Sequence, residues 1–75
     1  MARGFIHTVP VGGGLWRNRV ESMELLRGVY VRKDDAIAAG RREARRRKTE
    51  HVVHNWDGTI AERTSYESEL ARHPS

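Results

Sequence analysis

The densest group of chemically active side chains is the basic run RREARRRK, residues 41–48. Six Arg and Lys residues stand there against a single acid, Glu43. Six positive charges and one negative charge leave +5, while the whole chain carries +4. Side chains of this charge density neutralise phosphates, so a nucleic-acid backbone is the partner that the run fits best. The candidate nucleic-acid-binding residues are Arg41, Arg42, Arg45, Arg46 and Lys48, with Arg17 and Arg19 as a second basic group.

Two plainer interpretations of the run remain open. Runs of charge are usually solvated faces, and basic residues in the last turn of a helix stabilise its dipole. The dipole effect is worth only about 0.3–1 kcal/mol and is confined to that turn, so it does not require six basic residues. An acidic protein would be attracted by the same charges as a nucleic acid. Arg41, Arg45 and Lys48 would share one helical stripe, whereas Glu43 has the spacing to pair with Arg46 or Arg47.

Histidines are the next candidates, because imidazole is a common metal ligand. His51 and His54 lie three residues apart, so on a strand they face opposite sides, and His7 can approach either one only if the two segments pair. That arrangement supplies two ligands at best, while a structural zinc site needs about four. The sequence therefore predicts no metal and no cofactor. His7 and His54 are expected to be polar anchors that hydrogen-bond the backbone.

Catalytic patterns are missing from the sequence. Asp34 and Asp35 are adjacent, so on a helix their carboxylates diverge by about 100° and cannot share a substrate. The triple glycine at 12–14 has neither the Lys-Ser/Thr pair nor the helix that a phosphate-binding loop requires. No serine lies in a nucleophile elbow. The sequence predicts a domain that is not an enzyme.

Composition limits the architecture that must hold these side chains. Seventy-five residues make one domain at most, with 37% hydrophobic and 32% charged residues, which indicates a thin core and a well-solvated surface. The absence of cysteine excludes disulfides and thiolate zinc sites and fits a reducing compartment. No apolar run approaches the roughly 18 residues of a membrane span, and His7 and Pro10 interrupt the apolar stretch near the start. We expect a cytoplasmic protein without a membrane partner.

Residues 5–11, FIHTVPV, and 15–20, LWRNRV, favour two strands around the glycine turn. On the second strand, alternation places Trp16, Asn18 and Val20 on the inward face and the two arginines outward. Residues 21–31 suit either an extended strand with a kink at Gly28 or a helical turn, and the ending Val-Tyr-Val favours the extended form.

One helix is predicted over residues 33–47, where a narrow stripe of small and apolar side chains recurs at helical spacing. Asp34 and Asp35 in the first turn and the basic residues in the last complement the dipole. Gly40 costs a helix about 1 kcal/mol relative to alanine, so a packing reason is expected. The stripe comprises Ala36, Ile37, Gly40 and Ala44.

Asp57-Gly58 between two strand-like runs predicts a closing hairpin. A two-residue turn would pair Trp56 with Thr59, and a three-residue turn with a bulge at Gly58 would pair Asn55 with Thr59. Trp56 is the aromatic residue most easily left at the surface. Both registers remain open.

These elements predict an α+β, two-layer domain: a small antiparallel β-sheet with one main helix packed on one face. The domain covers residues 1–66, and residues 67–75 form a flexible polar tail.

Three segments, HTVPVGGGLW, RKDDAIAAGRREA and HVVHNWDGTIAERTSY, occur in an order that resembles domain-of-unknown-function family 2188, a family of small bacterial domains. The resemblance covers roughly residues 5–66 and implies a strand–strand–helix–strand–strand fold. Arg32 stands where the family pattern has a capping Thr. The family supplies no activity.

No specific biochemical function follows from these patterns. The sequence favours a binding or accessory module, with weak non-specific nucleic-acid binding through the basic helix end as the leading hypothesis. The alternative is a protein–protein interaction domain that self-associates as a homodimer through an apolar sheet surface.

Overall fold

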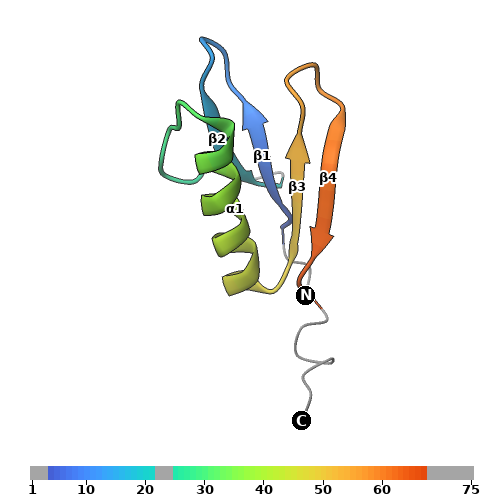
Figure 1. The fold of residues 1–75 in the computed structure, drawn as a ribbon. Helices are drawn as coiled ribbons and strands as arrows, with labels where there is room; N and C mark the ends of the chain where they lie inside the picture. The colour runs from blue at the N-terminus through green and yellow to red at the C-terminus, as the bar shows by residue number, and fades with distance from the viewer. Residues whose placement is uncertain (1–3, 22–24, 68–75) are drawn as a thin grey trace.

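The computed structural model describes residues 4–21 and 25–67, so the predicted flexible tail lies outside the described residues from position 68 onward. The order strand–strand–helix–strand–strand is confirmed, as is the predicted helix span of 33–47 (Figure 1). The elements are β1 (Ile6–Pro10), β2 (Trp16–Val20), α1 (Lys33–Arg47), β3 (Glu50–His54) and β4 (Ile60–Ser65).

The four strands form one sheet in the order β2-β1-β3-β4, with α1 on one face, so the α+β two-layer class is confirmed. The sheet is mixed rather than wholly antiparallel, because β1 and β3 pair in parallel. The chain reverses three times between β2 and β3: residues 25–30 return antiparallel to β2, α1 then runs back, and β3 turns again. Consequently β3 starts at the same end of the sheet as β1.

Residues 25–30 are extended beside β2, as the Val-Tyr-Val pattern favoured, but they make only isolated bridges, Trp16 with Tyr30 and Arg19 with Leu25. Gly28 has a φ of 103°, a left-handed conformation that glycine adopts without steric cost. The kink there interrupts the ladder, so the segment does not become a regular strand. Residues 22–24 lie outside the described part of the chain.

Helix α1 buries the small residues Ala36, Gly40 and Ala44, while Ile37 stays partly exposed. Its N-cap is Arg32, which makes no side-chain cap, as expected where the capping Thr is absent. Its C-terminus closes on Lys48, which adopts φ 57° and donates its N–H to Arg45 O while Thr49 N–H bonds Ala44 O.

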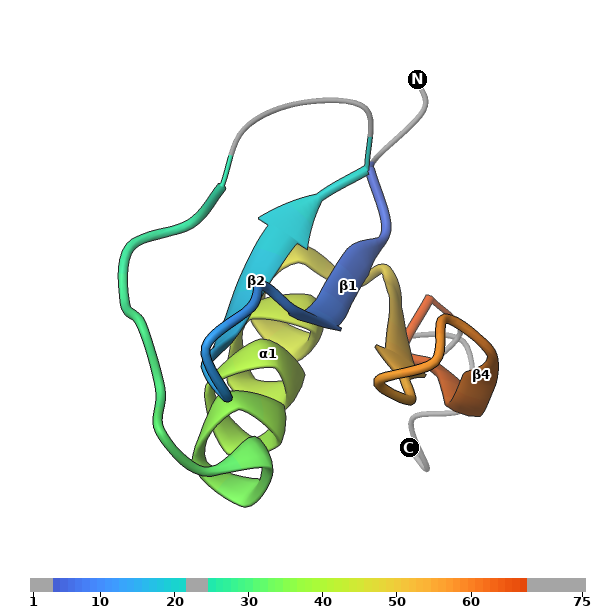
Figure 2. The ribbon, with the colours of Figure 1, turned by 90° about the horizontal axis from the view of Figure 1, so that it is seen from above.

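The helix covers only part of the sheet. Ile6, Val20 and Ala44 form a buried cluster, and Val52 and Val53 on β3 are buried on opposite faces. Residues of β4 are exposed except for partly buried Thr64, because α1 packs on the other three strands (Figure 2).

The closing hairpin adopts the three-residue turn. Asn55 N–H donates to Thr59 O at 2.7 Å, and Gly58 N–H donates to Asn55 O at 3.0 Å. Gly58 has a φ of 96°, which favours glycine at this position, and Asp57 Oδ1 accepts from both the Thr59 N–H and its hydroxyl. Trp56 lies on the turn and is 80% exposed, as predicted.

Candidate functional site

The structure divides the predicted basic residues between two surfaces. Asn18 and Val20 on β2 are buried beneath the helix, so alternation directs Arg17 and Arg19 to the opposite face of the sheet. The Arg17 guanidinium donates to Leu26 O at 3.0 Å and thereby holds the segment that follows β2. The residues that stay together on the C-terminal half of α1 and its cap are Arg41, Arg42, Arg45, Arg46 and Lys48.

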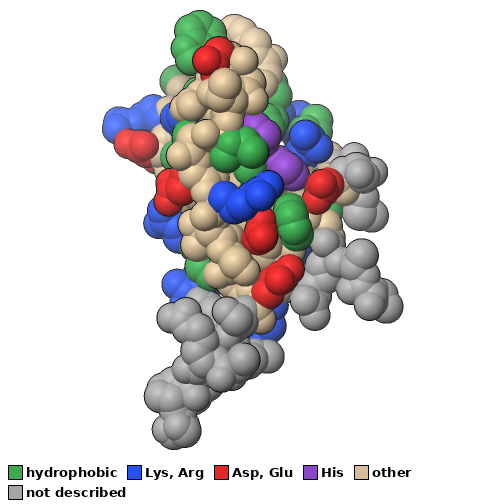
Figure 3. Space-filling model, turned by 90° about the vertical axis from the view of Figure 1, so that its right-hand side faces the viewer, with side chains coloured by type: hydrophobic (Ala, Val, Ile, Leu, Met, Phe, Trp, Pro, Cys, Tyr) green, Lys and Arg blue, Asp and Glu red, His purple; other side chains and the backbone are tan. Residues whose placement is uncertain are grey.

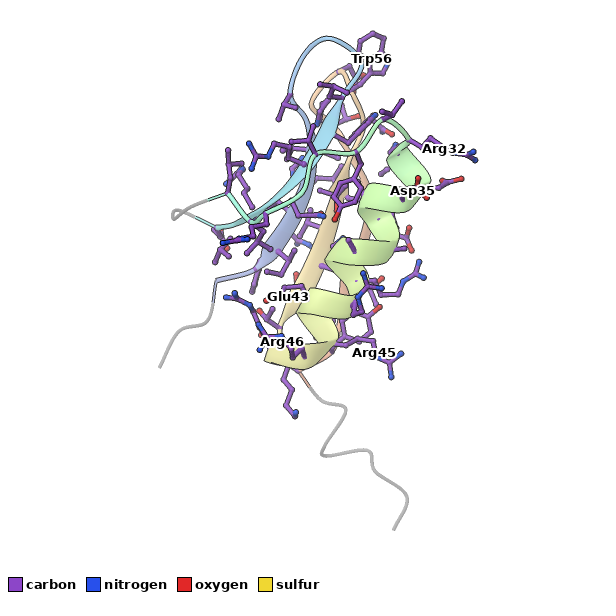
Figure 4. All side chains as sticks on the ribbon, turned by 90° about the vertical axis from the view of Figure 1, so that its left-hand side faces the viewer. Arg32, Asp35, Glu43, Arg45, Arg46 and Trp56 are labelled. Atoms are coloured by element: carbon purple, nitrogen blue, oxygen red, sulfur yellow. The ribbon has the colours of Figure 1, made fainter. Side chains whose placement is uncertain are left out.

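Glu43 neutralises part of this basic run. Its carboxylate accepts from Arg46 Nη2 and from Arg47 Nε, each at 2.5 Å. Chiefly the hydrogen bond from Arg46, opposed by burial and helped by Arg47, lowers the pKa of Glu43 below its usual value. Figure 4 shows Glu43 and Arg46 on one side of α1 and Arg45 on the other. The pairing that the sequence spacing predicted is confirmed, and it leaves Arg46 less available to a phosphate.

The stripe of Arg41, Arg45 and Lys48 is on the β4 side of the helix. The Arg45 guanidinium lies 5.8 Å from the centre of the Tyr66 ring. Arg41 acts electrostatically on His51 of β3 and is exposed. The stripe thus flanks the inner face of β4, which the helix leaves open.

A buried polar cluster lies directly beneath the middle of α1. The Thr8 hydroxyl is 2.5 Å from Asn18 Oδ1 and 2.8 Å from His51 Nε2, and Asn18 Nδ2 donates to Ala36 O at 3.0 Å. The bond from Asn18 Nδ2 to Ala36 O fixes the orientation of the amide, so the atom that faces Thr8 is the oxygen. An amide oxygen can only accept, so the Thr8 hydroxyl donates to it. Thr8 then accepts from His51, which must carry its proton on Nε2.

Sequence reasoning missed this cluster, although two of its signals were visible. Asn18 was placed on the inward face, and Gly40 indicated a packing constraint at mid-helix. Gly40 sits over the cluster so closely that a Cβ would lie 2.5 Å from Asn18 Oδ1.

Burial, with a smaller contribution from Arg41, lowers the pKa of His51 from the ordinary 6.5 to about 4. His51 is consequently neutral near pH 7, and its single ring proton is the one on Nε2 that bonds Thr8.

On the face of the sheet away from α1, the side chains of His7 and His54 contact each other. His7 Nδ1 lies 2.8 Å from His54 Nε2, with ring centroids 5.1 Å apart. The parallel pairing of β1 with β3 brings the two side chains together. We expected His7 and His54 to hydrogen-bond the backbone, but their imidazoles bond each other. Figure 3 shows histidine side chains at the surface among basic and acidic ones. Burial first, then Arg19 and His54, lower the pKa of His7, against the opposing effect of Glu21.

This distance fits a hydrogen bond in which one imidazole donates and the other accepts. Glu21 Oε1 is 3.9 Å from His7 Nε2 on the far side of the ring. Within residues 4–21 and 25–67, no three His, Cys, Asp or Glu side chains come together as a set of metal ligands.

We expect zinc at about tenfold excess to leave the melting temperature unchanged. A ligand that binds only the native state must raise that temperature, and two imidazoles fall short of the three or four protein ligands of zinc sites. The measurement is a thermal melt with and without the ion. A clear rise that disappears in His54→Ala would show that the pair binds zinc.

In the described part of the chain, no helix is long and apolar enough to cross a membrane. The family model of domain of unknown function 2188, whose description is "Uncharacterized protein conserved in bacteria", matches residues 6–66. No curated protein and no solved structure matches the chain. The family match includes every strand and the helix, and it carries no assigned activity. The chain therefore belongs to the bacterial family of domain of unknown function 2188.

Proposed function

We propose that this domain is a non-catalytic, cytoplasmic binding module that contacts nucleic acid weakly through the basic end of α1. The observation that carries the proposal is the stripe of exposed Arg41 and Arg45 and half-buried Lys48 at the C-terminal end of α1, beside β4, which α1 does not contact. Arg42 adds a further exposed charge on the same half of the helix. Glu43 pairs with Arg46 and Arg47 and offsets one of their two charges, so the run still presents a net positive charge to phosphates.

Contact through this surface would be electrostatic and tolerant of sequence. Arginine and lysine contacts to phosphates position a protein on a nucleic acid, whereas base-edge contacts in a groove specify sequence. Dissociation constants should be micromolar or weaker at physiological salt, because affinity from phosphate neutralisation falls steeply with ionic strength.

Replacing Arg41, Arg45 and Lys48 together with Ala should lower the slope of log K against log salt by about 2 to 3 on duplex DNA, because each lost phosphate contact removes about 0.9. The measurement is a salt titration of a labelled random duplex, with circular dichroism to show that the fold is kept. Arg19→Ala, on the opposite face of the sheet, is the control and should leave the slope unchanged. Absence of wild-type binding at about 50 mM salt would reject the proposal.

Self-association is the second candidate, favoured by the exposure of β4 at the edge of the sheet. An edge strand offers unpaired backbone groups to another chain. The alternating charges of Glu62 and Arg63 and the register shift after Val53 oppose such pairing, since charge and bulges are common protections of edges. A mass that rises with protein concentration, and a melting temperature that rises with it, would support a homodimer.

Binding to an acidic protein but to no nucleic acid would assign the basic stripe to a protein partner.

A further inference from the structure

A cavity of about 320 Å³ opens between α1 and the extended segment of residues 25–30. Its apolar walls are Leu26, Tyr30 and Ala39, and Arg27 and Arg42 line it with their basic side chains. Asn18 and Glu43 complete the lining. The volume falls at the lower end of the range for small-molecule sites, which is the size for one compact ligand.

The outer wall of this cavity is held in place by hydrogen bonds to β2. Tyr30 exchanges both backbone bonds with Trp16 at 2.8 Å, Leu26 N–H donates to Asn18 O at 2.9 Å, and Arg17 reaches Leu26 O. Gly28 makes the bend between these anchors, and a Cβ there would lie 2.6 Å from the Tyr30 hydroxyl. The glycine therefore allows the segment to close over the tyrosine ring, and the bonds to β2 fix the outer wall of the cavity.

Of the polar side chains that line the cavity, some already have hydrogen-bond or ionic partners and others can bind an occupant. Asn18 is committed to Thr8 and Ala36, and the Glu43 carboxylate to Arg46 and Arg47. No ion pair to another described residue holds the exposed Arg27 or Arg42. An occupant thus meets apolar walls with two guanidinium groups, which suits a flat ring that carries a phosphate.

We propose that this cavity takes one nucleotide of a single-stranded nucleic acid, with the base against Leu26, Tyr30 and Ala39 and a phosphate on Arg27 and Arg42. The inference rests on the proposed function and deepens it, because Arg42 belongs to the same basic helix end. Bases in a duplex are stacked and paired inside the helix, whereas an unpaired base can be turned into a pocket against an aromatic side chain. Single strands should therefore bind more tightly than duplexes with the same number of phosphates.

The test is Ala39→Leu, which fills the cavity from the helix. The matched control is Ala38→Leu, at an exposed neighbouring position that does not line it. Affinities are measured for a labelled oligothymidylate and for a random duplex at equal salt. We expect Ala39→Leu to weaken single-strand binding about tenfold, within the range for one lost stacking contact, and to leave duplex binding unchanged.

Arg27→Ala provides a second variant at an exposed position that does not depend on refilling the cavity. It should lower the salt slope on the single strand by about 0.7 and leave the duplex slope unchanged, because Arg27 lies outside the basic run. Equal single-strand affinity in wild type and Ala39→Leu would overturn the cavity proposal. Duplex binding that depends on the helix stripe, without a preference for single strands, would also overturn it while the proposed function stands. No binding to either oligonucleotide would remove both.

Discussion

Gly40→Ala is expected to lower the free energy of unfolding by about 2–3 kcal/mol, even though alanine is the better helix former by about 1 kcal/mol. The new Cβ would lie 2.5 Å from Asn18 Oδ1, 2.6 Å from His51 Nε2 and 2.8 Å from Thr8 Oγ1. Either the helix moves away from the sheet or the buried hydrogen bonds break. Both outcomes cost more than the helix propensity returns, because a buried polar group without a partner costs about 1–3 kcal/mol.

The measurement is urea or thermal unfolding, where this loss corresponds to a melting temperature lower by roughly 10–20 °C for a domain of this size. Ala38→Gly is the matched control at an exposed site on the same helix, and it should cost only about 1 kcal/mol. If Gly40 were merely a weak point of the helix, Gly40→Ala would instead raise stability. That result would contradict the close approach of α1 to the polar cluster.

Acidification from pH 7 to pH 5 is expected to lower the free energy of unfolding by about 2 kcal/mol through His51 alone. Its pKa falls from 6.5 to about 4 on folding, chiefly by burial. A group with a depressed folded pKa binds protons more readily in the unfolded chain, so acid favours unfolding. Stability from this group is present above pH 6.5 and is lost as the pH falls toward 4. The lowered pKa of His7 contributes in the same direction.

His51→Gln separates this effect from other titrations, because a glutamine amide can still donate to Thr8 without taking up a proton. Its unfolding free energy should change less between pH 7 and 5 than that of wild type. Asp and Glu residues titrate mainly below this window. The lowered pKa of His7 contributes to the remaining slope, and His7→Gln in the same background should reduce it. An unchanged pH profile in His51→Gln would show that His51 titrates normally in the folded protein.

Local patterns in the sequence were sufficient for the individual elements. The small-residue stripe predicted the helix at 33–47, the Asp-Gly pair located the hairpin, and alternation placed Asn18 inward. Each of these signals acts within a few residues, because helical periodicity, turn conformations and strand alternation are local properties of the chain. The resemblance to the family was carried by the same local motifs and was confirmed by the match over residues 6–66.

The spatial relations between the elements came only from the tertiary structure. Parallel pairing of β1 with β3 brings His7 to His54 rather than to His51, across 47 residues of sequence. Which partner a side chain meets at that separation depends on the path of the whole crossover and on how closely α1 can approach the sheet. No short pattern encodes either quantity, so Gly40 could be recognised as constrained without revealing the buried polar groups that constrain it.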